Sequence, residues 1–356
     1  MVRLGLERAR TADEAVRVIG ELVERYGQGG SCEAGSFRTY QNSFILADPT
    51  TAWVLETAGH RWIAERVEDR AAISNLLTIH GGGGRSSPGI EQHARDQGWV
   101  DGDFDFARAY QDPDADLTTR VCRLDRARTV LGGYRSPIDV RDMMALLRDH
   151  GDGDLPSGAR ALPSICMHAN PASPGETAAA MVVQLRPDRP RELATTCWTA
   201  FGSPCLSVFR PVYPFAVGLP TLLDRGGAAF DPDSPWWVFE WLQRLVARAP
   251  SLAGEVRAAF AALEFRFMEQ AADAEGLALD ALSRGNRTKA LRALRVVVDS
   301  TTRRALECAE TLTAELADRS EAEAIPAMAG FWANVNQNVD LHAGMPFPVL
   351  AGSAAP

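Results

Sequence analysis

A thiol and an imidazole lie two positions apart, at Cys166 and His168. In an extended strand, residues two apart point to the same face, so the two side chains could form a thiolate–imidazole pair or supply two ligands to a metal ion. A third ligand at a suitable spacing is missing from the sequence. A buried cysteine is more often a small apolar core residue, so the pattern favours a core residue and leaves the two functional interpretations open.

A single amide side chain, Asn75, interrupts the otherwise apolar residues 72–79. A buried amide must find hydrogen-bond partners, because leaving its donors or acceptor unpaired costs free energy. Asn75 therefore either braces a loop or offers N–H donors to a site. The residues alone favour neither interpretation.

Hydrophobic periodicity predicts the elements that would position these side chains. Apolar residues at steps of three and four predict a helix over residues 12–26, with Thr11 and Glu14 as a capping box and Gly27 beyond its end. Short apolar segments bounded by turns predict antiparallel strands at residues 43–47, 52–56, 61–64, 72–79, 164–169, 179–185, 194–201 and 208–214. A helix over residues 140–150, begun by Ser136-Pro137, is predicted between the two groups of strands.

From residue 234 onwards, the apolar residues recur at the steps of three and four that are typical of helices. We expect a helix over residues 236–247 and an antiparallel helical hairpin over residues 253–316, with its turn at Arg284-Gly-Asn286. Strands and helices grouped in blocks indicate an α+β fold. The predicted organisation is a core domain at residues 1–230 with strands within 42–215, a helical region at 231–342 packed on it, and a flexible tail at 343–356.

Composition excludes several classes of protein. The 356 residues are 46% hydrophobic and 23% charged, which is typical of a globular chain, and the net charge of −9 opposes binding to nucleic acid. No run is long and apolar enough to predict a membrane span, and the absence of a secretory signal and of paired cysteine spacings predicts a cytoplasmic location. Because Gly81-Gly-Gly-Gly84 lacks a phosphate-loop pattern and no zinc-protease, GxSxG or kinase motif occurs, we expect no cofactor and no metal.

Several ordered stretches together resemble the secernin and cysteine dipeptidase family of N-terminal nucleophile (Ntn) hydrolases. The resemblance covers most of the chain, and its order is preserved. The stretches are Asp13-Glu-Ala-Val16, Gly27-Gln-Gly-Gly30, Asn42-Ser-Phe-Ile-Leu-Ala-Asp48, Ala52-Trp-Val-Leu-Glu-Thr-Ala-Gly59, Ser74-Asn-Leu-Leu-Thr-Ile79, residues 92–99, Ile165-Cys-Met-His168, and Trp237 with Glu240 and Arg244.

The resemblance implies an αββα sandwich and hydrolysis of amide bonds in dipeptides or small acyl-amino compounds. In that scheme an N-terminal cysteine thiolate attacks the carbonyl carbon, and its own α-amino group moves the proton. Asn75 matches the asparagine that donates to the oxyanion in related enzymes. Glu56 and His168 match family positions without an assigned role, and with Cys166 we predict them to bind substrate.

The resemblance also implies a departure at the start of the chain. Family members begin with the nucleophile and continue through about eighty residues before the helix that opens here at Met1, a stretch longer than an ordinary connection. Removal of Met1 would expose Val2, and Cys32 follows Ser31 in a glycine-rich turn, so neither supplies the expected nucleophile. We therefore expect the chain as given to be inactive.

Three interpretations follow from that departure. The chain is an amidohydrolase whose gene begins upstream of Met1, an inactive relative that acts as a binding or assembly protein, or a protein with different chemistry at Cys166 and His168. Without the first strands of a sandwich, neighbouring strand edges and apolar surface would be exposed. We therefore expect the purified chain to be poorly soluble or to form a homo-oligomer.

Overall fold

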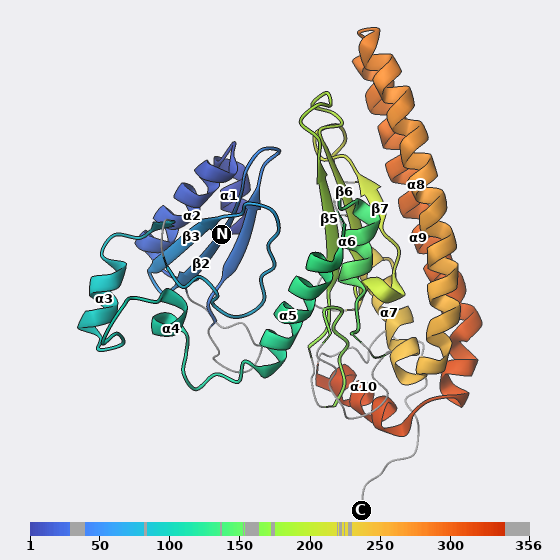
Figure 1. Cartoon of the computed structure of the whole chain (residues 1–356). Coiled ribbons are helices and arrows are strands. Elements are labelled where there is room, and N and C mark those ends of the chain that lie inside the picture. Colours follow the sequence, from blue (N-terminus) through green and yellow to red (C-terminus); the bar gives the residue numbers. More distant parts are fainter. Residues whose placement is uncertain are drawn as a thin grey trace, which may run out of the picture. The chain divides into compact units, whose positions relative to one another are not determined.

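The chain folds into two α+β units. The structure is a computed structural model, and it describes residues 1–28, 40–81, 84–135, 137–151, 153, 164–171, 175–218, 220, 223, 225–226 and 230–338. The units are Met1–Tyr134 and Arg135–Pro356. Each has its own small antiparallel sheet and its own helices (Figure 1). The predicted domain boundary at residue 230 falls inside the second unit, and the predicted tail at 343–356 lies outside the described residues.

The first unit is built on a four-stranded antiparallel sheet of order β1-β2-β3-β4. The strands predicted at residues 43–47, 52–56 and 61–64 are confirmed. The elements of this unit are α1 (Val2–Arg8), α2 (Ala12–Tyr26), β1 (Ser43–Ala47), β2 (Ala52–Ala58), β3 (Arg61–Arg66), β4 (Arg85–Ser86), α3 (Ile90–Asp96), α4 (Phe106–Tyr110) and α5 (Thr118–Gly133).

Helix α2 covers one face of this sheet, and its bounds match the prediction. The Thr11 hydroxyl accepts a hydrogen bond from the Glu14 N–H (3.1 Å), while the Glu14 carboxylate accepts from Arg10 N instead of completing the predicted capping box. Gly27 ends the helix at φ +67°, a conformation that favours glycine. The apolar face of α2 packs against alternate residues of β2 and β3 in a cluster that includes Val16, Ile19, Val23, Trp53, Leu55, Trp62 and Ala64.

The opposite face of the sheet is covered by residues 71–80 and by α3 and α4. Here the prediction of a strand at residues 72–79 is wrong, because this segment forms no ladder and bends at Asn75 and Leu76. Leu77 and Ile79 pack with Ala58 and Ile63 on the face of the sheet rather than extending its edge. The backbone is instead held by the carboxylate of Glu56.

The second unit contains a three-stranded antiparallel sheet of order β5-β6-β7. The strands predicted at 179–185 and 194–201 are confirmed within one residue, whereas the one at 208–214 is reduced to three residues. The elements are α6 (Val140–Leu147), β5 (Ala179–Leu185), β6 (Thr195–Phe201), the 3₁₀ helix η1 (Pro204–Leu206), β7 (Arg210–Val212), α7 (Pro235–Arg248), the 3₁₀ helix η3 (Pro250–Leu252), α8 (Ala253–Ser283), α9 (Arg287–Ala322) and α10 (Pro326–Asn338).

Two further predictions in this unit need correction. Helix α6 starts at an Asp139 capping box and ends at Leu147, so it stops before His150. The predicted strand at residues 164–169 is irregular chain. The backbone N–H of Cys166 donates to the Asp149 carbonyl, while Met167 pairs with Thr177, so successive residues bond to different segments instead of to one neighbouring strand.

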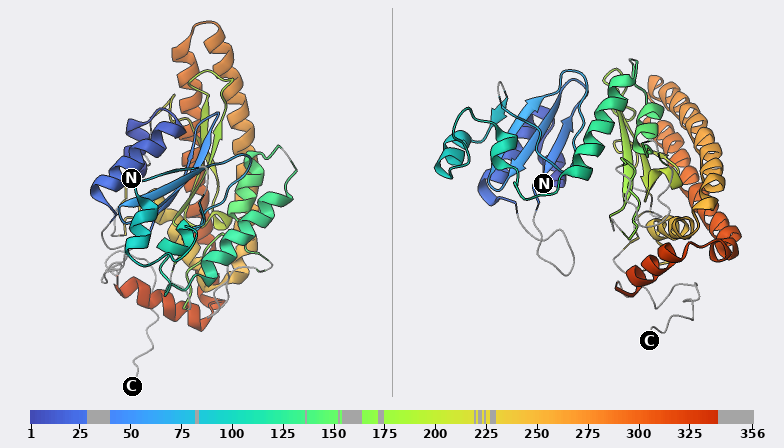
Figure 2. Two further views of the ribbon diagram at one scale, coloured as in Figure 1. Left: turned by 60° about the vertical axis from the view of Figure 1, so that its left-hand side comes forward. Right: turned by 60° about the horizontal axis from the view of Figure 1, so that its bottom comes forward.

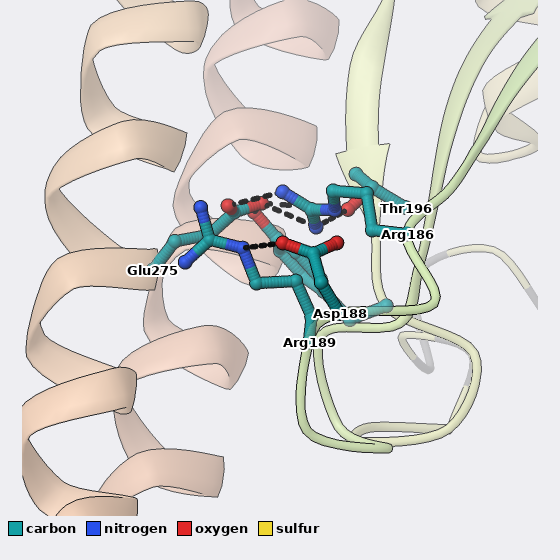
Figure 3. A network of polar contacts seen from close by, with 6 residues as sticks. Arg186, Asp188, Arg189, Thr196 and Glu275 are labelled. Carbon is teal, nitrogen blue, oxygen red and sulfur yellow. Dashed lines mark hydrogen bonds and ion pairs between the residues drawn. The ribbon is translucent and has the colours of Figure 1, made fainter.

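The predicted helical hairpin is confirmed by α8 and α9, which lie side by side in every view (Figure 2). Gly285 turns the chain between them at φ +72°. The Arg186 guanidinium makes two hydrogen bonds to the carboxylate of Glu275 on α8 (2.6 and 3.0 Å) and one to Thr196 on β6 (2.6 Å) (Figure 3). This ion pair attaches the hairpin to the sheet.

Within the residues that the structure describes, no helix combines the length and apolar character needed to cross a membrane. The two antiparallel sheets with flanking helices confirm the α+β class. The αββα sandwich of an Ntn hydrolase stays a prediction.

Candidate functional site

The first unit contains a cavity of about 1140 Å³ that is lined by both polar and apolar groups. Its walls come from the start of β1, the bend that follows β3, and the chain between α4 and α5. No cysteine belongs to the part of the wall that the structure describes. The lining residues include Gln41, Ser43, Asn75, Gln111, Asp112 and Arg120.

Asn75 lies on this wall, but it is exposed on a bend and not buried in an apolar strand as predicted. Its side-chain oxygen accepts a hydrogen bond from Arg123 Nη2 (2.9 Å), and its carbonyl accepts one from Arg120 Nη1 (3.3 Å). A guanidinium group only donates, so the oxygen end of the amide must face Arg123. The Nδ2 end has no hydrogen-bond partner among the described residues and is available to a ligand in the cavity.

Glu56 is fully buried on β2, on the sheet face that residues 71–80 cover. Its carboxylate accepts hydrogen bonds from the backbone N–H of Thr78 (2.8 Å), the Thr78 hydroxyl (2.7 Å) and the backbone N–H of Ile79 (3.0 Å). Both oxygens are engaged, so the group holds the segment that carries Asn75. The predicted role of Glu56 in substrate binding stays a prediction.

Cys166 and His168 belong to the second unit and do contact each other, although they are not on a strand. The distance from Cys166 Sγ to His168 Nε2 is 3.5 Å. Two residues that the sequence patterns missed join them: His150 Nε2 and Cys205 Sγ lie 3.1 and 3.2 Å from the same nitrogen. The four potential ligand atoms all lie within 4.8 Å of one another.

The two thiols of this cluster are buried, and their pKa values are shifted in opposite directions. A hydrogen bond shared with Cys166 lowers the pKa of Cys205, and contacts with His150 and His168 lower it further. The same hydrogen bond, together with burial, raises the pKa of the Cys166 thiol. No motif spacing could have revealed this set, because its members come from three separate segments of the chain.

A second buried polar group lies on α7, among residues that carry the family resemblance. Arg244 Nε donates to Glu240 Oε1 (2.6 Å), and the guanidinium lies over the rings of Trp237 (5.5 Å) and Trp332 (4.7 Å). Both charged side chains are buried. The carboxyl of Glu176 interacts with Glu240 of this pair. Its pKa is raised to about 8, mainly by burial and next by the negative charge of Glu240.

The variant Glu176→Gln is expected to flatten the dependence of stability on pH. In the wild type, the folded state binds the Glu176 proton more tightly than the unfolded state, whose pKa is near 4.5. The protonated Glu176 therefore stabilises the folded state fully below about pH 4.5, and this stabilisation is lost as the pH rises towards about 8. The free energy of unfolding should fall by about 2 kcal/mol over this range after allowance for solvent screening.

Urea unfolding between about pH 5 and about pH 8 measures this effect. Glu310→Gln, an exposed change on α9 of the same unit, serves as the control and should keep the wild-type slope. An unchanged slope in Glu176→Gln would show that this carboxyl is already ionised in the folded protein.

The family model of peptidase family C69 matches residues 1–115 and 135–259 of this chain. This is more than half of the sequence, and the chain belongs to peptidase family C69. The matched residues include Asn75 and Glu56 in the first unit and all four members of the Cys/His cluster in the second. The resemblance to cysteine dipeptidases is thereby confirmed.

Two curated relatives are proteins of Streptococcus pyogenes named "Probable dipeptidase A". The protein from serotype M18 (strain MGAS8232) is 26% identical over 284 residues, which cover 69% of this chain and 56% of that protein. The protein from serotype M1 is 25% identical over 287 residues, with the same shares of each chain. The chain thus spans about half the length of the curated relatives that it matches.

Proposed function

We propose that this chain carries the substrate cavity of a cysteine peptidase that hydrolyses the amide bond of dipeptides or of similar small acyl-amino compounds. Membership of peptidase family C69 and the names of the two streptococcal relatives support this reaction class. Asn75 is the residue that we assign to catalysis, as a donor to the oxyanion that forms when the carbonyl carbon is attacked.

The orientation of the Asn75 amide is the observation that carries this assignment. Arg123 holds the oxygen end at 2.9 Å, and this contact fixes the amide so that its N–H groups are presented away from the guanidinium. A donor that is oriented before the reaction stabilises developing negative charge without reorganising. Glu56 supports the arrangement by bonding Thr78 and Ile79, close to Asn75 in the chain.

The nucleophile is a cysteine at the mature N-terminus in the proposed scheme. Its thiolate forms a bond to the carbonyl carbon, the amine leaves with a proton, and water then releases the acyl group. The assignment leaves Cys166 and Cys205 outside this reaction. No cysteine lines the described part of the Asn75 cavity.

The test is a dipeptidase assay on two proteins: residues 1–356, and the product of the longest reading frame that contains them. We expect hydrolysis of unmodified dipeptides by the longer product and its loss when the N-terminal cysteine is replaced by alanine. Dipeptide binding by both proteins without turnover in either would instead support the alternative, an inactive relative that acts as a binding protein.

A further inference from the structure

The cluster of His150, Cys166, His168 and Cys205 cannot be explained by hydrogen bonding alone. One ring nitrogen, His168 Nε2, has three neighbours at 3.1, 3.2 and 3.5 Å. A neutral imidazole nitrogen carries either one N–H or one lone pair, so it can satisfy only one such neighbour. Four potential ligand atoms that all lie within 4.8 Å of one another are an arrangement that a metal ion could hold together.

The three separations measured from His168 Nε2 are close to those of a tetrahedral zinc site. With Zn–N near 2.0–2.1 Å and Zn–S near 2.3 Å, the edges of a tetrahedron are about 3.4 Å between two nitrogens and about 3.6 Å between nitrogen and sulfur. The observed separations of 3.1 Å between the two imidazoles and 3.2–3.5 Å from imidazole to thiol differ from these by a few tenths of an ångström. The remaining separations among the four atoms lie within 4.8 Å, so the ligands would have to draw together by at most about 1 Å to surround the ion.

The surrounding structure holds the ligands in place independently of any ion. Arg148 Nε donates to the Pro204 carbonyl (2.9 Å), which ties the segment before His150 to the segment that carries Cys205. The same guanidinium makes two hydrogen bonds to Glu264 on α8 (2.6 and 2.9 Å). The Cys166 N–H bonds the Asp149 carbonyl (3.1 Å), so the three ligand-bearing segments form one braced unit.

We propose that His150, Cys166, His168 and Cys205 bind one Zn²⁺ ion in a closed structural site. Two thiolates and two imidazoles in a tetrahedron are a preferred ligand set for zinc, whereas magnesium and calcium prefer oxygen ligands. All four positions are filled by protein, and both thiols are buried beside the apolar core of the second unit, so the ion links segments and does not bind substrate. The proposal replaces the expectation of no metal and does not depend on the proposed peptidase activity.

The first test measures the zinc content of the full chain purified under reducing conditions from cells grown with added zinc. We expect about one zinc per chain in the wild type and loss of stoichiometric zinc in Cys205→Ser and His168→Gln. Cys197→Ser is the matched control: Cys197 is a partly buried cysteine on β6 of the same unit, outside the cluster, and its variant should retain the ion.

A second measurement uses wild-type protein only, so it stays informative if a ligand variant does not fold. Removing zinc with a chelator should lower the melting temperature, and adding zinc should restore it. Adding Co²⁺ to the zinc-free protein should produce the visible absorption of a tetrahedral ion and a thiolate-to-cobalt charge-transfer band.

Three results would overturn the zinc site. The first is wild-type protein that contains little zinc and gives no thiolate-to-cobalt band. The second is an equal loss of zinc from the Cys197→Ser control. The third is a Cys166–Cys205 disulfide in the native protein, detected by peptide mapping after thiol blocking, because a disulfide removes both thiolates from the ligand set.

Discussion

Replacing Arg244 by leucine is expected to lower the free energy of unfolding of the second unit by about 3–5 kcal/mol. The Arg244 guanidinium donates to Glu240 at 2.6 Å, and Glu240 is only 1% exposed. Leucine keeps part of the contact with Trp237 and Trp332 but leaves a buried carboxylate without this cation. The cost arises from that uncompensated charge. Urea unfolding followed by tryptophan fluorescence measures the change.

Two further variants separate charge from packing. Combining Arg244→Leu with Glu240→Gln removes the buried charge and should recover most of the lost stability. Arg284→Leu disrupts an ion pair with Asp280 at the same four-residue spacing, but both side chains are exposed, so its cost should stay below about 1 kcal/mol. If Arg244→Leu were as mild as Arg284→Leu, the buried pair would have no special role in stability.

Replacing Asn75 by alanine is expected to lower kcat at least about a hundredfold in the active protein and to leave KM nearly unchanged. Loss of one oxyanion donor costs about 3 kcal/mol in the transition state, where the negative charge develops. The ground state lacks that charge, so substrate binding changes little. Steady-state kinetics with a dipeptide measures both constants.

Asn75→Asp distinguishes catalysis from bracing. Aspartate keeps an oxygen for Arg123, which now bonds Asn75 at 2.9 Å, but it replaces the N–H donors with a second acceptor. If Asn75 donates to the oxyanion, Asn75→Asp should fold normally and turn over as slowly as the alanine variant. Near-normal turnover by a folded Asn75→Asp protein would show that Asn75 only braces Arg123. The control is Gln111→Ala, which removes the hydrogen bond from Leu77 N–H to the Gln111 side chain on the same cavity wall. It shows how much turnover is lost when the wall is loosened without any change at Asn75.

The sequence by itself determined the elements whose hydrogen bonds are local or lie between neighbouring segments. Helix α2, strands β1 to β3 and the α8–α9 hairpin all have a clear apolar period and turn residues at their ends. The ordered family resemblance also directed attention to Asn75 and to the pair Cys166 and His168. The family match confirms the resemblance itself, whereas the roles of these residues stay predictions.

Tertiary structure decided what an apolar pattern cannot specify, namely the partner of each segment. Residues 72–79 and 164–169 are short, largely apolar segments of the kind that predicts strands, yet their backbone groups bond to Glu56, Asp149 and Thr177 instead of to a sheet. Periodicity reports which side chains become buried, but it does not report what satisfies the backbone. For this reason Asn75 was predicted in a strand and lies on an exposed bend.

The Cys/His cluster depended most completely on tertiary structure. Cys166 and His168 were visible as a pair, but the other two members come from the chain after α6 and from η1, at distances along the sequence that match no metal motif. Their convergence depends on long-range contacts, above all the bonds from Arg148 to Pro204 and Glu264. A ligand set brought together by such contacts has no local spacing, so only the folded chain could reveal it.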